Sequence, residues 1–123
     1  MYGVILFWRV KFGCLAEHDE IMREALVAER ERCPELLLNL PFGPSADGTF
    51  GAVQVYADEA AYRAFPDRVG RYDARLWELW TRSGAISEPS AAQTFHFEGM
   101  GFLDEAFVRA AAGVGRFERS GAE

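Results

Sequence analysis

Apolar and polar residues follow one another along the chain in a pattern that predicts a β-α-β-β-α-β order of elements. Runs rich in branched and aromatic side chains predict four strands, over Val4–Val10, Glu35–Phe42, Thr49–Ala57 and Ala92–Glu98. Between the first two strands, apolar residues recur every three or four positions, which predicts a helix over Ala16–Cys33. Acidic residues begin this segment and arginines end it, as the helix dipole favours, and Pro34 stops it.

Two further helices are expected between the third and fourth strands. Asp58 suits the cap of the first, because its carboxylate can accept hydrogen bonds from the amides of the first turn. Pro66 lacks a backbone donor, so we expect a kink or restart there and a second helix over Asp67–Ser83. The segment Leu103–Ala112 has the pattern of a short C-terminal helix.

This order of elements is the split βαβ, or ferredoxin-like, arrangement of the α+β class, with an antiparallel sheet. A chain of 123 residues is one domain by ordinary size. We expect the domain to span residues 1–98, and residues 99–123 to form a C-terminal extension.

Both faces of the predicted sheet carry apolar side chains. In the first strand Leu6 and Trp8 fill one face, while Ile5 and Phe7 lie on the other. Helices cover only one face in this topology, and monomers rarely expose an apolar patch of more than a few hundred Å². The second face therefore predicts a homodimer packed sheet against sheet, with a C-terminal segment folded back over the sheet as the alternative.

Composition excludes several classes of partner. The formal net charge of -6 argues against a nucleic-acid partner, which would require clustered lysine and arginine. No stretch reaches the roughly 18 apolar residues of a membrane span. The apolar N-terminal run has no basic residues before it and ends at Arg9, unlike a signal peptide. Cys14 and Cys33 form no disulfide framework, so we expect a cytoplasmic protein.

The segment Tyr56–Pro66 (YADEAAYRAFP) joins a strand end, an acidic capping residue, a short alanine and aromatic helix, and a proline. With the element order over residues 2–98, it resembles the dimeric α/β-barrel superfamily, which includes antibiotic-biosynthesis monooxygenases and stress-responsive barrel proteins. The resemblance implies two ferredoxin-like subunits and oxygenation of an aromatic substrate without a bound cofactor. Haem-degrading and stress-responsive members typically carry a histidine near that proline, where this chain has Phe65 and Arg68, so haem chemistry is not implied.

Five polar residues interrupt the apolar strands and form the core of the candidate site: Arg9, Asn39, Gln54, Tyr56 and His96. Burying such a group unpaired costs about 1–3 kcal/mol, so these residues either satisfy one another at the dimer seam or line a pocket. In the pocket interpretation His96 is the proton shuttle and Arg9 holds an anionic group. Either Tyr56 or Asn39 orients a substrate oxygen. Besides the catalytic candidates His96 and Tyr56, the substrate-binding candidates are Arg9, Asn39, Gln54, Trp77 and Trp80.

Tryptophans and acidic residues give weaker signals. Trp77 and Trp80, with Trp8 and Tyr72, form either an aromatic wall for a planar ligand or ordinary core. The run Glu17–Glu20 contains one histidine and is interpreted as a solvated first helical turn, not as a metal site. No metal or other cofactor is predicted.

Two functions stay open at this level. One is a small-molecule pocket protein that acts as a cofactor-independent monooxygenase on an aromatic substrate. The other is a non-catalytic ligand-binding or structural dimer. For the first, His96→Ala and Tyr56→Phe are expected to abolish turnover of a polyphenolic probe.

Overall fold

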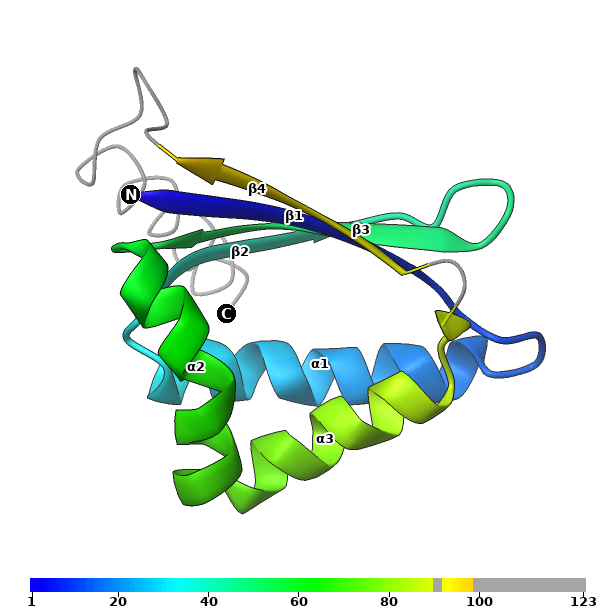
Figure 1. Ribbon diagram of the computed structural model, residues 1–123. Helices are drawn as coiled ribbons and strands as arrows, with labels where there is room; N and C mark the ends of the chain where they lie inside the picture. Colours follow the sequence, from blue (N-terminus) through cyan, green and yellow to red (C-terminus); the bar gives the residue numbers. More distant parts are fainter. Residues whose placement is uncertain (90–91, 99–123) are drawn as a thin grey trace, which may run out of the picture.

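In the part of the chain that the structure describes, three helices cover one face of a four-stranded antiparallel sheet (Figure 1). The computed structural model describes residues 1–89 and 92–98. Neighbouring strands lie in the order β2-β3-β1-β4. The elements are β1 (Tyr2–Arg9), α1 (Leu15–Arg32), β2 (Leu36–Phe42), β3 (Thr49–Tyr56), α2 (Glu59–Tyr72), α3 (Ala74–Ala85) and β4 (Gln93–Glu98).

The strand register decides which side chains face the helices. Val4 on β1 lies opposite Gln54 on β3 and His96 on β4, so these three side chains share one face. That face packs on the helices, and the main core joins it to α1, α2 and α3. Its most deeply buried side chains are Val4, Ile21, Val69, Leu76 and Leu79. The α+β ferredoxin-like prediction is therefore confirmed, with strand bounds within two residues of those expected.

The break between the second and third helices is not where the sequence predicted it. The prediction placed it at Pro66, but α2 continues through this proline to Tyr72. The break falls at Asp73, whose carboxylate accepts from the Leu76 amide at 3.1 Å and from Arg32 Nε at 2.8 Å. An N-terminal cap tied to another helix gives a well-defined start for α3, whereas Pro66 costs α2 one hydrogen bond.

The second face of the sheet is apolar, and no helix among residues 1–89 and 92–98 covers it (Figure 1). Phe42, Phe7 and Phe95 form an aromatic row across β2, β1 and β4, with ring centroids 6.0 and 6.1 Å apart. Gly51 leaves room for this row, because a Cβ there would lie within 3.0 Å of both Phe42 and Phe7. About half the surface of Phe42 (48%) and of Phe95 (50%) is exposed.

The structure also bears on the cysteines and on the predicted C-terminal helix. Cys14 and Cys33 are both free, and Cys33 is buried. The predicted helix over Leu103–Ala112 and the extension 99–123 lie outside the described residues. Within the described part of the chain, none of the helices has the length and apolar character that crossing a bilayer requires.

Candidate functional site

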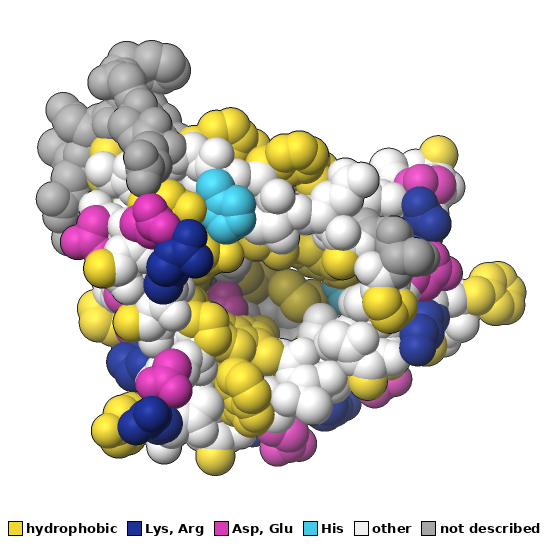
Figure 2. All heavy atoms as spheres, viewed as in Figure 1, with side chains coloured by type: hydrophobic (Ala, Val, Ile, Leu, Met, Phe, Trp, Pro, Cys, Tyr) yellow, Lys and Arg dark blue, Asp and Glu magenta, His cyan; other side chains and the backbone are white. Residues whose placement is uncertain are grey.

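A cavity of about 450 Å³ lies between the sheet and the helices. Figure 2 shows the hollow between the sheet above and the helices below, with hydrophobic side chains gathered around it. A volume of this size is in the range of small-molecule sites. Apolar side chains line most of it, among them Leu6, Ile21, Ala25, Phe65, Leu79 and Trp80.

Glu29 places a carboxylate in this apolar cavity. It lies on the inner face of α1, where Ala25 and Cys33 one turn to either side are also buried, and only 7% of its surface is exposed. Asn39 Nδ2 donates to one carboxylate oxygen at 2.8 Å, and Trp80 Nε1 donates to the other at 3.4 Å. Glu29 is not among the candidates predicted from the sequence. Its one signal was the four-residue spacing from Ala25 and Cys33.

The surroundings of Glu29 change its acidity. Burial raises the pKa of the carboxyl from the ordinary 4.5 to about 6, while hydrogen bonds from Trp80 and Asn39 offset part of that rise. A carboxylate with a pKa of about 6 is ionised at neutral pH and is a stronger base than an exposed one. Glu29 can therefore accept a proton from a bound ligand.

The same pKa makes a prediction for stability. The pKa of Glu29 is higher in the folded protein than in the unfolded chain, so folding takes up a proton at pH values between these two pKa values. The stability of the folded protein therefore falls as pH rises through this range. Through this group the native protein should lose about 2 kcal/mol of unfolding free energy between pH 4 and pH 7. Glu29→Gln cannot titrate, so urea unfolding should show its stability relative to native rising by that amount over this interval. A difference that stays constant with pH would contradict the buried, ionising carboxyl.

Three polar candidates named from the sequence also line the cavity. Tyr56 Oη donates to Gln54 Oε1 at 2.8 Å, and Asn39 bonds Glu29 as described. Burial, then the negative charge of Glu29, raises the pKa of Tyr56, so its hydroxyl stays protonated at neutral pH. Asn39 Oδ1 is buried without a hydrogen-bond partner among the described residues and is an open acceptor.

Three other candidates are not among the residues that line it. His96 lies on the edge strand β4, where Nδ1 is 2.8 Å from Tyr2 Oη and the ring contacts Tyr62 beside the cavity. Arg9 forms ion pairs with Glu88 at 3.3 Å and Asp47 at 3.4 Å. Trp77 is 46% exposed.

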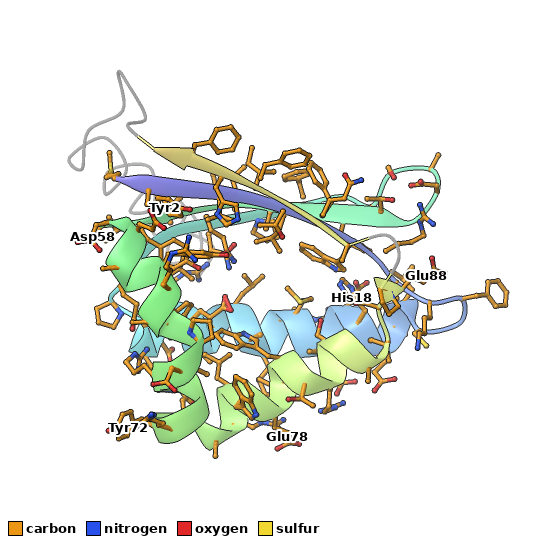
Figure 3. All side chains as sticks on the ribbon, viewed as in Figure 1. Tyr2, His18, Asp58, Tyr72, Glu78 and Glu88 are labelled. Atoms are coloured by element: carbon orange, nitrogen blue, oxygen red, sulfur yellow. The ribbon has the colours of Figure 1, made fainter. Side chains whose placement is uncertain are left out.

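The four aromatic residues proposed as a wall are divided by the fold. Trp8 and Trp80 line the cavity from β1 and α3. Tyr72, labelled in Figure 3, lies at the outer end of α2, away from the sheet, and like Trp77 is not a lining residue. The wall therefore consists of two tryptophans from different elements, together with Tyr62 and Phe65 of α2.

His18 corrects the prediction of a solvated first turn on α1. Its side chain is 2% exposed and packs against Phe50 on the sheet, with ring centroids 4.3 Å apart (Figure 3). Trp8 Nε1 donates to His18 Nε2 at 2.9 Å, and His18 Nδ1 lies 3.1 Å from Asp19 Oδ1. The register of α1 against the sheet turns this histidine inward, although acidic residues surround it in the sequence.

The described residues offer no set of metal ligands. Within residues 1–89 and 92–98, no three His, Cys, Asp or Glu side chains come close enough to hold a metal ion. The chemistry available in the cavity includes proton transfer at Glu29 and hydrogen bonding at Asn39, Gln54 and Tyr56; the hydroxyl residues Ser83, Ser87 and Thr94 also line it.

Several solved structures share this fold. The chain is similar to SnoaB, a cofactor-independent oxygenase from Streptomyces nogalater, with a TM-score of 0.61 and 14% identity over 83% of this chain and 95% of that one. An antibiotic biosynthesis monooxygenase gives 0.65 and 18%, over 82% of this chain and 100% of that one. A NIPSNAP family protein from Agrobacterium tumefaciens gives 0.63 and 13%, over 82% and 94%.

These likenesses concern the fold. They confirm the ferredoxin-like architecture and the structural resemblance to antibiotic-biosynthesis monooxygenases that the sequence suggested. No protein-family model and no curated protein matches the sequence.

Proposed function

We propose that this protein is a cofactor-independent oxygenase that binds a hydroxylated aromatic compound in the cavity. The observation that carries the proposal is the buried Glu29 carboxylate, a basic group in a largely apolar cavity with tryptophans on two sides. A phenolic hydroxyl fits the hydrogen-bonding groups, because Glu29 and the open Asn39 Oδ1 are both acceptors and need a donor.

The first step is proton transfer from the phenolic hydroxyl to Glu29. The resulting phenolate is electron-rich, and the low dielectric of the cavity leaves its charge poorly solvated unless nearby donors stabilise it. The Gln54 amide group is available as such a donor, since its oxygen already accepts from Tyr56.

Molecular oxygen is the co-substrate and the oxidant. An electron-rich phenolate can reduce O₂ and combine with it at a ring carbon that carries hydrogen. Conversion of a phenol to a quinone then uses one O₂: one oxygen atom becomes the second carbonyl, and the other leaves as water with the two hydrogens that the substrate loses. The similarity to SnoaB, itself described as a cofactor-independent oxygenase, supports this choice of reaction class.

A non-catalytic binding function is the second candidate. It is favoured by the mutual pairing of the cavity's polar groups, with Tyr56 bonded to Gln54 and Glu29 bonded to Asn39 and Trp80. Groups that satisfy one another can line a binding site without taking part in a reaction.

Thermal shift against a panel of polyphenols, with oxygen uptake followed in parallel, separates the two. Oxygen consumption at one O₂ per quinone formed supports the oxygenase. Stabilisation by a ligand that causes no oxygen uptake or product favours binding alone. If no compound in the panel either stabilises the protein or is consumed, the proposed ligand class is wrong.

We propose further that the apolar sheet face pairs two copies of the chain. The aromatic row of Phe42, Phe7 and Phe95 runs across the face that the helices leave open, and a second copy related by a two-fold axis would remove it from water. Each copy keeps its own cavity, since the helices lie on the opposite face (Figure 1). We place this dimer in the cytoplasm, where Cys14 and Cys33 stay reduced.

A further inference from the structure

A second cavity of about 310 Å³ lies beside the first. Trp8, Met22 and Pro41 line both, so these side chains form the partition between the two spaces. The second cavity is otherwise mainly apolar, with Leu26, Phe42 and Phe50 in its walls, and Asp19 and Arg23 are the charged residues that line it.

The indole of Trp8 is held in this partition by a hydrogen bond. An indole N–H can only donate, so the buried His18 accepts through Nε2 at 2.9 Å. In the neutral ring the proton is then on Nδ1, which points to Asp19 Oδ1 at 3.1 Å. The Trp8 ring also lies nearly parallel to Phe50, with an interplanar angle of 12°. These contacts fix the position of the indole.

The partition and the proposed base are separated along the first cavity. Met22 and Glu29 both line it from α1 and are seven residues apart, which is about 10 Å along a helix. A ligand whose hydroxyl meets Glu29 and whose body follows α1 therefore extends toward Trp8. Beyond the indole is the second cavity.

We propose that Trp8, held by His18, determines how long a ligand the protein accepts, and that the second cavity is an apolar subsite closed off by this indole. The proposal rests on the proposed function only for which end of the ligand lies at Glu29. In the native protein the ligand ends at the indole. Removing the indole joins the two cavities and admits a longer apolar or aromatic body.

A series of 4-alkylphenols of increasing chain length tests this, with dissociation constants measured by calorimetry. Each methylene that enters apolar surroundings should tighten binding about fourfold, until the chain meets the indole and the gain stops. In Trp8→Leu the gain should continue for several more methylenes, so that the longest phenols bind at least about tenfold more tightly than to native protein. The chain length at which the gain stops is the break point of the series. The same break point in native protein and in Trp8→Leu would overturn the proposal.

Further variants test the contribution of His18 and remain informative if Trp8→Leu does not fold. His18→Leu removes the acceptor but keeps the indole, and should shift the break toward longer chains. His18→Gln retains an acceptor oxygen and should restore the native break. Trp77→Leu removes a tryptophan that lines neither cavity, so the break point should stay where it is in native protein. A break that moves in Trp8→Leu but not in His18→Leu would overturn the role of His18.

A parallel series of n-alkylbenzenes separates this proposal from the proposed function, because these compounds have no hydroxyl for Glu29. The same break in alkylbenzenes, with no added affinity from a phenolic hydroxyl, would support the length limit and count against the role of Glu29. Binding of neither series to native protein would overturn the length limit itself.

Discussion

Replacing Glu29 with glutamine should lower kcat by about 10²–10⁴-fold for any hydroxyarene that the native protein oxidises. Glutamine matches the shape of glutamate and can still accept from Asn39 or Trp80, but it cannot take up the substrate proton. Phenol binding should change much less than kcat, because most of the cavity surface is apolar and unaltered. Oxygen uptake and quinone formation under single-turnover conditions give the rate, and calorimetry gives the affinity.

The pH profile gives a second test of Glu29. Only the ionised carboxylate accepts a proton, so kcat/KM of the native protein should rise about tenfold per pH unit below pH 6 and level off above it. The residual activity of Glu29→Gln should lack this step. A native profile with no inflection near pH 6 would argue that another group accepts the proton.

Two comparison variants make the result specific. Glu31→Gln removes the same charge from an exposed position two residues further along α1, and native turnover is expected. His96→Ala tests the base that the sequence suggested, and with Glu29 in that role it should also leave turnover close to native. Turnover lost in His96→Ala but kept in Glu29→Gln would reverse the assignment.

Placing a charge in the aromatic row should convert the proposed dimer to a monomer. Phe95→Asp and Phe42→Asp each put a carboxylate at a position that is half exposed in one chain but covered in a sheet-on-sheet dimer. An unpaired buried charge costs about 3–5 kcal/mol, and two-fold symmetry introduces it twice, so the dissociation constant should rise by well over 10³-fold. Native mass spectrometry should give twice the 13.8 kDa chain mass for the unaltered protein and the chain mass for each variant.

Phe12→Asp is the matched control for these variants. Phe12 is a fully exposed phenylalanine in the loop between β1 and α1, off the sheet, so its replacement should leave the dimer intact. Circular dichroism should show that all three variants remain folded. A native protein that is monomeric at micromolar concentration would refute sheet-on-sheet pairing, and the C-terminal segment would then become the candidate cover.

Much of the architecture is encoded in local patterns that can be recognised without coordinates. Side chains alternate between the two faces of a strand, so the sequence around Leu6 and Phe7 predicts both a strand and the face on which each side chain lies. The register of β1 against β3 confirms this prediction. The polar residues in the apolar strands left a pocket and a dimer seam open as alternatives; in the structure Asn39, Gln54 and Tyr56 line the cavity, whereas Arg9 and His96 do not. The face of the sheet on which each of these side chains lies follows from its position in the strand.

The tertiary structure alone decided which acid lies in the cavity. Glu29 is followed by Arg30, Glu31 and Arg32, a run that is typical of an exposed helix surface. Its burial depends on the rotation of α1 against the sheet and on donors from β2 and α3. The two donors, Asn39 and Trp80, are ten and 51 residues away from Glu29 along the chain, so no local sequence pattern indicates these contacts.

The same reason explains the other differences between sequence and structure. His18 is surrounded by acidic neighbours, yet it is buried because the side chains of Trp8 and Phe50, which are paired on neighbouring strands of the sheet, pack over it. The second and third helices separate at Asp73 and not at Pro66, because Asp73 has both an amide to cap and an arginine from α1 to bind. The sequence by itself determined the elements and their faces, since those depend on residues a few positions apart. The tertiary structure decided which polar groups meet, since those contacts join residues that only the packing of helices on the sheet brings together.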